Sequence, residues 1–100
     1  MSDETNVSDL RAQVDEINMQ LLELLTRRAN IVSQIGKMHT TMGVSHYDPA
    51  REAEMLTALE HANKGPFSNE TIKALFREIF RASLALEEQQ GLPSDLATAA

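Results

Sequence analysis

A long amphipathic segment near the N-terminus limits the fold of this chain more than any other feature. Between residues 10 and 38 the only glycine or proline is Gly36. Apolar side chains recur along this segment at about 100° per residue, the period of an α-helix. The apolar stripe consists of Leu10, Val14, Ile17, Leu21, Leu24, Leu25, Val32 and Ile35. We expect a helix from Val7 or Ser8 to about Thr40, which is roughly 50 Å long.

A helix of this length cannot be covered by the rest of a 100-residue chain. A compact globule of that size has a radius of gyration of only about 13 Å. The simplest way to bury the stripe is a second copy of the same helix, so the sequence predicts an intertwined homodimer. Apolar residues make up 42% of the chain, with three prolines and four glycines, which favours an all-α fold with a packed core.

Two breaks in the sequence divide the chain into three helices. Gly43 ends the first helical region, and Asp48 followed by proline is a strong restart signal, with aspartate as N-cap and proline at the first helical position. The second helix is therefore expected over residues 49–62. A Lys-Gly-Pro sequence at residues 64–66 breaks it.

The third helix is expected to follow Ser68, a second N-cap, and to end near Gln90, before a Gly-Leu-Pro sequence. The domain prediction is one helical domain over residues 7–90. Residues 1–6 are expected to be a disordered N-terminus, and residues 91–100 a linker stub or flexible tail.

The composition excludes several classes of function. A net charge of -6 argues against nucleic-acid binding, which requires a basic face. The chain has no cysteine, so it has no disulfide or thiolate metal site, and a reducing cytoplasm is the expected location. The acidic, polar N-terminus is unlike a signal peptide, and no apolar run approaches the length of a membrane span. A small anion could still bind to a local cluster of arginines.

Polar side chains lie at positions where the helical pattern calls for apolar ones. Arg28 is at the middle of the first apolar stripe, and His39 follows three turns later, within about 20° of it. The complete set is Arg28 and His39 on the first helix, Asp48, Arg51 and Glu52 on the second, and Ser83 and Glu87 on the third. Buried charges are costly unless they are paired, so this set indicates a polar pocket for an anionic ligand.

Each of these residues also has an ordinary structural explanation. Asp48 is first of all a helix cap, and a buried serine such as Ser83 often bonds back to its own helix. A lone histidine such as His39 is more often structural than functional. His46 and His61 are assigned to a loop or the surface, with no function.

Arg11 requires a different explanation. It lies about 100° around the helix from Arg28 and roughly 25 Å away along the axis. It cannot easily share a pocket with Arg28 of its own chain. In a dimer of crossed or antiparallel helices it could reach the pocket of the partner.

Four motifs occur in order along the chain: Leu10-Arg11 with Asp15, Leu24-Leu25-Thr26-Arg27-Arg28, Ile35-Gly36-Lys37, and Asp48-Pro49-Ala50-Arg51-Glu52. Together they resemble the AroQ-type, all-helical chorismate mutases, over about residues 7–90. The sequences at residues 65–68 and 75–80 resemble the subgroup that is fused to the N-terminus of DAHP synthase.

The resemblance implies a three-helix chain that dimerises through its long first helices. It also implies the Claisen rearrangement of chorismate to prephenate, in aromatic amino acid biosynthesis, without a metal or cofactor. By similarity, two arginines hold the substrate carboxylates, and the other site residues contact its ring, hydroxyl and ether oxygen. These roles fall to Arg28, Arg11 from the partner chain, Asp48, Arg51, Glu52 and Ser83, with His39 and Glu87 at the ether oxygen.

Two positions depart from this pattern or qualify it. The family has a lysine at the position of His39, and a neutral, shorter histidine is a weaker donor. Glu87 stands where some members have glutamine, and it must be protonated to donate a hydrogen bond. Two alternatives therefore remain open: a weakly active domain that senses prephenate or chorismate for DAHP synthase, and a helical dimerisation module with buried ion pairs.

Overall fold

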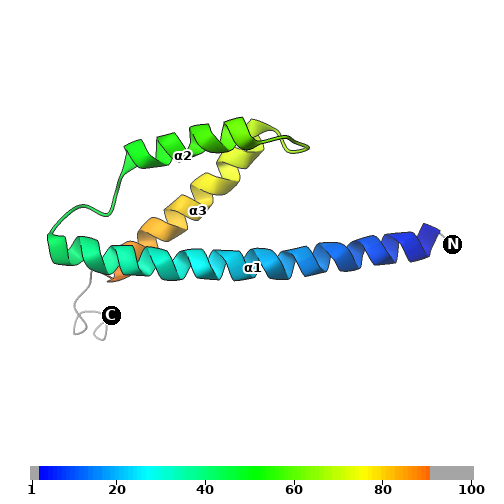
Figure 1. The fold of residues 1–100 in the computed structure, drawn as a ribbon, viewed down its shortest axis with the longest axis horizontal. Coiled ribbons are helices and arrows are strands. Elements are labelled where there is room, and N and C mark those ends of the chain that lie inside the picture. Colours follow the sequence, from blue (N-terminus) through cyan, green and yellow to red (C-terminus); the bar gives the residue numbers. More distant parts are fainter. Residues whose placement is uncertain (1–2, 91–100) are drawn as a thin grey trace. The chain divides into compact units, whose positions relative to one another are not determined.

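Three α-helices joined by two short segments make up the protein. The computed structural model describes the backbone of residues 3–90 and the side chains of residues 6–90. The helices are α1 (Asp3–Met42), α2 (Pro49–Ala62) and α3 (Asn69–Gln90) (Figure 1). Within residues 3–90 there is no strand. The predicted all-α class is therefore confirmed.

The boundaries of α2 and α3 agree with the sequence prediction, whereas α1 is longer than expected. The helix begins at Asp3 rather than near Val7, and it ends at Met42 rather than near Thr40. Ser8 and Asp9 are residue types that often cap a helix, but both have helical backbone here, because a capping preference is weak compared with the continuity of a helical pattern.

The expected terminal segments are only partly covered by the structure. Residues 3–6, for which the sequence predicts disorder, belong to α1. The predicted tail at residues 91–100 lies outside the described residues. None of the three helices in the described part is both long enough and apolar enough to cross a membrane.

The predicted caps account for the start of each shorter helix. The Asp48 carboxylate accepts a hydrogen bond from the backbone N–H of Arg51 at 3.1 Å, with proline following at the first helical position. The Ser68 hydroxyl accepts one from the backbone N–H of Thr71, also at 3.1 Å. Gly43 ends α1 with a φ of 70°, a conformation that glycine adopts without a steric penalty.

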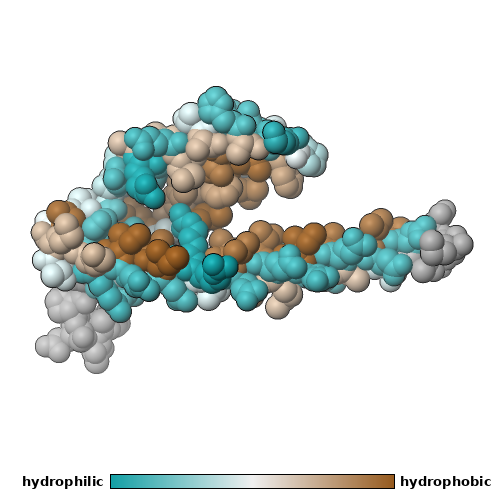
Figure 2. Space-filling model, in the orientation of Figure 1, coloured by the Kyte–Doolittle hydropathy of each residue, from teal (hydrophilic) through white to brown (hydrophobic). Residues whose placement is uncertain are grey.

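The chain divides into two compact units, Met1–Ile31 and Val32–Ala100. The described part of the first unit is helical throughout, so its apolar stripe has no core of its own to enter. Six stripe residues are between 44% and 58% exposed: Leu10, Val14, Ile17, Leu21, Leu24 and Leu25. Figure 2 shows apolar side chains along one side of this part of α1 and polar ones along the other.

The second unit contains the end of α1 together with α2 and α3. Its buried apolar side chains among the described residues are Val32 and Phe80, which are 9% and 8% exposed. The Phe80 ring lies 6.2 Å from the ring of Phe76, one turn earlier on α3. An ion pair of 3.1 Å joins Lys73 of α3 to Glu60 of α2, and this carboxylate raises the pKa of Lys73.

Gly36 allows α1 and α3 to approach each other closely within the second unit. A Cβ atom at this position would lie 3.0 Å from both the Cα and the carbonyl oxygen of Glu87, and 3.3 Å from the Cβ of Gln90. The crowding atoms of Glu87 belong to the backbone, so they cannot move aside as a flexible side chain would. A glycine is therefore required here by packing.

We expect Gly36→Val to destabilise the protein by about 1–3 kcal/mol, because the added side chain forces α3 away from α1. Ala58→Val, at an exposed position of α2, is the matched control, since it carries only the modest cost of valine in a helix. Thermal unfolding of both variants measures the difference. Equal losses of stability would contradict the close contact.

Candidate functional site

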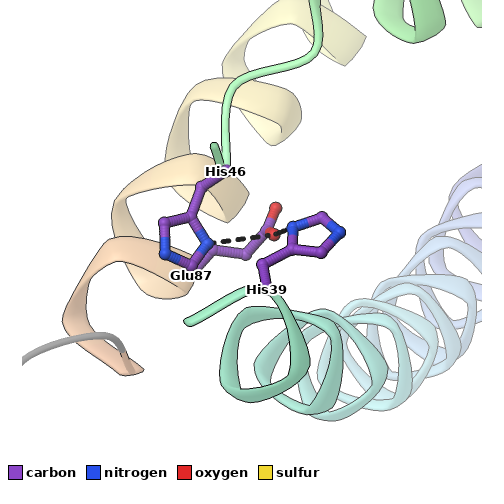
Figure 3. A group of neighbouring side chains, drawn as sticks. All are labelled: His39, His46 and Glu87. Atoms are coloured by element: carbon purple, nitrogen blue, oxygen red, sulfur yellow. Dashed lines mark ion pairs between the residues drawn. The ribbon is translucent and has the colours of Figure 1, made fainter. Parts of the chain in front are cut away.

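Two histidines and a glutamate meet in the second unit. The Nδ1 atom of His39 lies 3.5 Å from Oε1 of Glu87, and the Nδ1 atom of His46 lies 3.7 Å from the same oxygen. Figure 3 shows the two rings on either side of the carboxylate, with these nitrogens facing it. The ring centroids are 5.8 Å apart. We call these three residues the His–Glu–His cluster.

Three separate segments bring the His–Glu–His cluster together. His39 lies in the last turn of α1, and Glu87 lies near the end of α3, where the Gly36 contact holds the two backbones close. After Gly43 the chain turns back, with the N–H of Val44 bonded to the carbonyl of His39 at 3.0 Å. This turn returns His46 toward the end of the helix it has just left.

The polar atoms of the His–Glu–His cluster are largely shielded from water. The side chains of His39, His46 and Glu87 are 32%, 18% and 15% exposed. Both Nδ1 atoms and the Glu87 Oε1 atom are buried and form no hydrogen bond among the described residues. Such a group can hold a proton or a cation between its members, or present a donor to an oxygen atom of a ligand.

The sequence pattern predicts two members of this cluster and misses the third. His39 and Glu87 are both expected at the site, and the structure brings them together. His46 is expected in a loop without function. Helical periodicity carries no information about a residue in a loop, and the backward turn after Gly43 is what moves His46 into place.

The predicted site residues at the start of α2 have local contacts. Asp48 is the N-cap described above, and both Asp48 and Arg51 are exposed. Glu52 is half-buried in the first turn of α2. On α3, the Ser83 hydroxyl donates a hydrogen bond of 2.7 Å to the carbonyl of Ile79. The structural explanations expected for Asp48 and Ser83 are thus confirmed.

The two predicted carboxylate-binding arginines lie in the other unit. Arg11 is exposed and Arg28 is half-buried on α1, both within Met1–Ile31. The remaining predicted site residues all lie in Val32–Ala100. Their grouping around a ligand stays a prediction.

Comparison with known proteins links these observations to one family. Residues 10–88 match the model of the family described as chorismate mutase type II. The structure of chorismate mutase (Form II) from Thermus thermophilus is 50% identical, with a TM-score of 0.83, over 85% of this chain and 97% of that one. Form I of the same enzyme is 49% identical, with a TM-score of 0.76, over 78% and 98% of the two chains.

Curated relatives of the chain are longer proteins. A bifunctional chorismate mutase/prephenate dehydratase from Pseudomonas aeruginosa is 38% identical over 93 residues, which cover 88% of this chain and 26% of the relative. The T-protein of Haemophilus influenzae is 36% identical over 86 residues, or 85% and 23% of the two chains. The chain therefore spans about a quarter of the length of these relatives.

Proposed function

This chain belongs to the chorismate mutase type II family, and we propose that it converts chorismate to prephenate, a step of aromatic amino acid biosynthesis. The observation that carries the proposal is the similarity to the Thermus thermophilus enzyme, which extends over 97% of that chain at 50% identity. Almost the whole chain of that enzyme is therefore matched by this one. The proposed activity thus needs no segment outside the family domain.

The residues proposed for the site suit a rearrangement within one molecule. The reaction needs no nucleophile, so the protein has to hold a flexible dianion in its compact, reactive shape. Arginine is suited to the two carboxylates, because its planar guanidinium group donates two parallel hydrogen bonds. We assign these contacts to Arg28 and to Arg11 of a second chain. Asp48, Arg51, Glu52 and Ser83 are assigned to the ring and hydroxyl side.

His39 and Glu87 are proposed to stabilise the charge that grows on the breaking ether oxygen. Donors aimed at developing charge are among the strongest sources of catalysis. The Nδ1 atom of His39 and the Oε1 atom of Glu87 lie 3.5 Å apart, which supports a role for both side chains at the same atom of the substrate. An ionised Glu87 would repel the ether oxygen, so the proposed mechanism requires the carboxylic acid form.

We propose that the active form is a homodimer that joins two α1 helices along their apolar stripes. The six half-exposed stripe residues of the first unit form an apolar face of a kind that soluble monomers rarely leave uncovered. A second copy offers the same face, as a symmetric dimer requires. Arg11 lies on this helix and would then serve the site of the partner.

The wider setting of the domain is also a proposal. The bifunctional relatives combine the chorismate mutase named in their description with prephenate dehydratase. The fusion to DAHP synthase expected from residues 65–68 and 75–80 rests on that resemblance alone. A cytoplasmic location fits the absence of cysteine in the chain.

A regulatory role is the second candidate, and the His–Glu–His cluster favours it. If Glu87 pairs as a carboxylate with its two histidines, it cannot donate to the ether oxygen, while the arginines can still bind a dianion. Calorimetric titration with prephenate and a turnover assay with chorismate separate the two functions. Micromolar affinity with negligible turnover would favour the sensing domain.

Purified protein should consume chorismate, and Arg28→Ala should lower kcat/KM at least about 100-fold through the loss of charge-assisted hydrogen bonds. Arg27→Ala is the matched control, because Arg27 is the exposed neighbour of the same residue type. Loss of chorismate absorbance measures both. No turnover by the unaltered chain, or equal effects of the two variants, would refute the proposed enzyme.

Mixing two inactive variants should restore activity if each site takes Arg11 from one chain and Arg28 from the other. Refolding equal amounts of Arg11→Ala and Arg28→Ala together gives a mixture in which heterodimers keep one intact site. We expect about a quarter of the activity of the unaltered protein, from random pairing. Activity that stays at the level of the separate variants would contradict the shared site.

His39→Lys should raise kcat/KM at neutral pH by about 10- to 100-fold, because a charged ammonium group donates more strongly to the ether oxygen than a neutral ring. His61→Lys adds the same charge at an exposed position of α2 and serves as the control. Steady-state kinetics with chorismate compare the two. A gain in both variants, or in neither, would count against the role of His39.

A further inference from the structure

The geometry points to a divalent metal site, suited to Zn²⁺, formed by His39, His46 and Glu87. Each residue offers one ligand atom, and these three atoms lie within 4.8 Å of one another. Two imidazoles and one carboxylate are a common ligand set for zinc when a fourth position is left to water or a ligand. None of the functions proposed above uses a metal ion.

The two nitrogen–oxygen distances within the His–Glu–His cluster are close to those of a zinc site, and the ligand atoms of the two histidines lie within 4.8 Å of each other. With metal–ligand bonds of roughly 2.0–2.2 Å and tetrahedral angles, neighbouring ligand atoms are about 3.3–3.6 Å apart. The two nitrogen–oxygen separations are 3.5 and 3.7 Å. These separations lie within that range or just beyond it. Small rotations of the side chains would bring both histidines to the metal, since His46 lies in a short loop rather than in a helix.

A hydrogen bond on the far side of His46 leaves its inner nitrogen suited to a metal. The Thr40 hydroxyl donates to the carbonyl of Gly36 at 3.0 Å, so toward His46 it acts as an acceptor. The Nε2 atom of His46 lies 3.4 Å from this hydroxyl, so we assign the ring proton to Nε2, which then donates a hydrogen bond to the hydroxyl oxygen. The Nδ1 atom then has a free lone pair, directed at Glu87. Metal-binding histidines are commonly oriented through their second nitrogen in this way.

The burial of these atoms supplies an independent reason to expect a cation. Both Nδ1 atoms and the Glu87 oxygen are shielded from water and lack a hydrogen bond within the described part of the chain. A neutral His46 in this tautomer and an ionised Glu87 would face each other as two acceptors, which is unfavourable in a shielded position. A metal ion among the three atoms satisfies all of them at once.

The metal site would overlap the proposed catalytic site, and this part of the inference rests on the proposed function. A metal held by Glu87 and His39 withdraws both from the ether oxygen, so Zn²⁺ should inhibit chorismate turnover. Metal binding itself is measured without substrate. A protein that binds zinc but does not turn over chorismate therefore separates the metal site from the proposed enzyme.

The test is titration of the purified, metal-stripped chain with Co²⁺ and with Zn²⁺. We expect the visible absorbance of four-coordinate cobalt to appear with one ion per chain, and Zn²⁺ to displace it. His46→Asn and Glu87→Gln should each weaken binding by more than about 100-fold, since even an outer-shell partner is worth about 10- to 100-fold. Thr40→Val, which removes only that partner, should weaken binding about 10-fold.

His61→Asn is the matched control, because it removes the one histidine of the chain outside the cluster. Its affinity for cobalt should equal that of the unaltered chain. Three results would overturn the site: no cobalt spectrum, a spectrum unchanged in both His46→Asn and Glu87→Gln, or an equal loss in His61→Asn. Each variant is compared at a temperature where its helical content matches that of the unaltered protein.

Discussion

The close approach of two backbones at Gly36 is the contact on which the arrangement of the second unit depends. A side chain there would meet the Cα and carbonyl oxygen of Glu87 at 3.0 Å. The glycine therefore does more than permit packing, because the residue it contacts is the one whose carboxylate enters the His–Glu–His cluster. Three positions after Gly36 on α1, His39 reaches the same carboxylate. One small residue thus sets both the helix contact and the position of a catalytic candidate.

Local sequence signals were sufficient for most of the fold. Asp48 with its proline, and Ser68, predicted the first turns of α2 and α3, because side-chain caps act over three residues and are readable from the sequence. The predicted start of α1 is too late, because a residue with a strong capping preference lies inside this helix. Ser8 is a good cap in isolation, but an uninterrupted helical pattern continues through it. A cap is informative only where the pattern also stops.

The candidate site was predictable only in part, because it depends on contacts between distant residues. His39 and Glu87 stand out in the sequence as polar residues on apolar faces, and they do meet. His46 lies in the segment between α1 and α2, where no periodicity applies, and its position follows from the turn at Gly43. Its contact with Glu87 becomes visible only when the loop is folded back onto the end of the helix. Helical periodicity does not predict which loop residues lie beside a site, so such residues are the hardest to identify from sequence alone.

The His–Glu–His cluster also bears on His39, which stands where the resemblance to the chorismate mutases implies a lysine. A protonated lysine would bring a positive charge and three donors to Glu87 and leave no lone pair for a metal. A histidine brings a group that can be a donor, an acceptor or a metal ligand, and it stands opposite a second histidine with the same options. A carboxylate between two such rings can share a proton with either of them or join both in binding a cation. A histidine rather than a lysine at residue 39 therefore gives a site whose chemistry depends on what occupies it, because the loop that carries His46 brings a second ring to the same carboxylate.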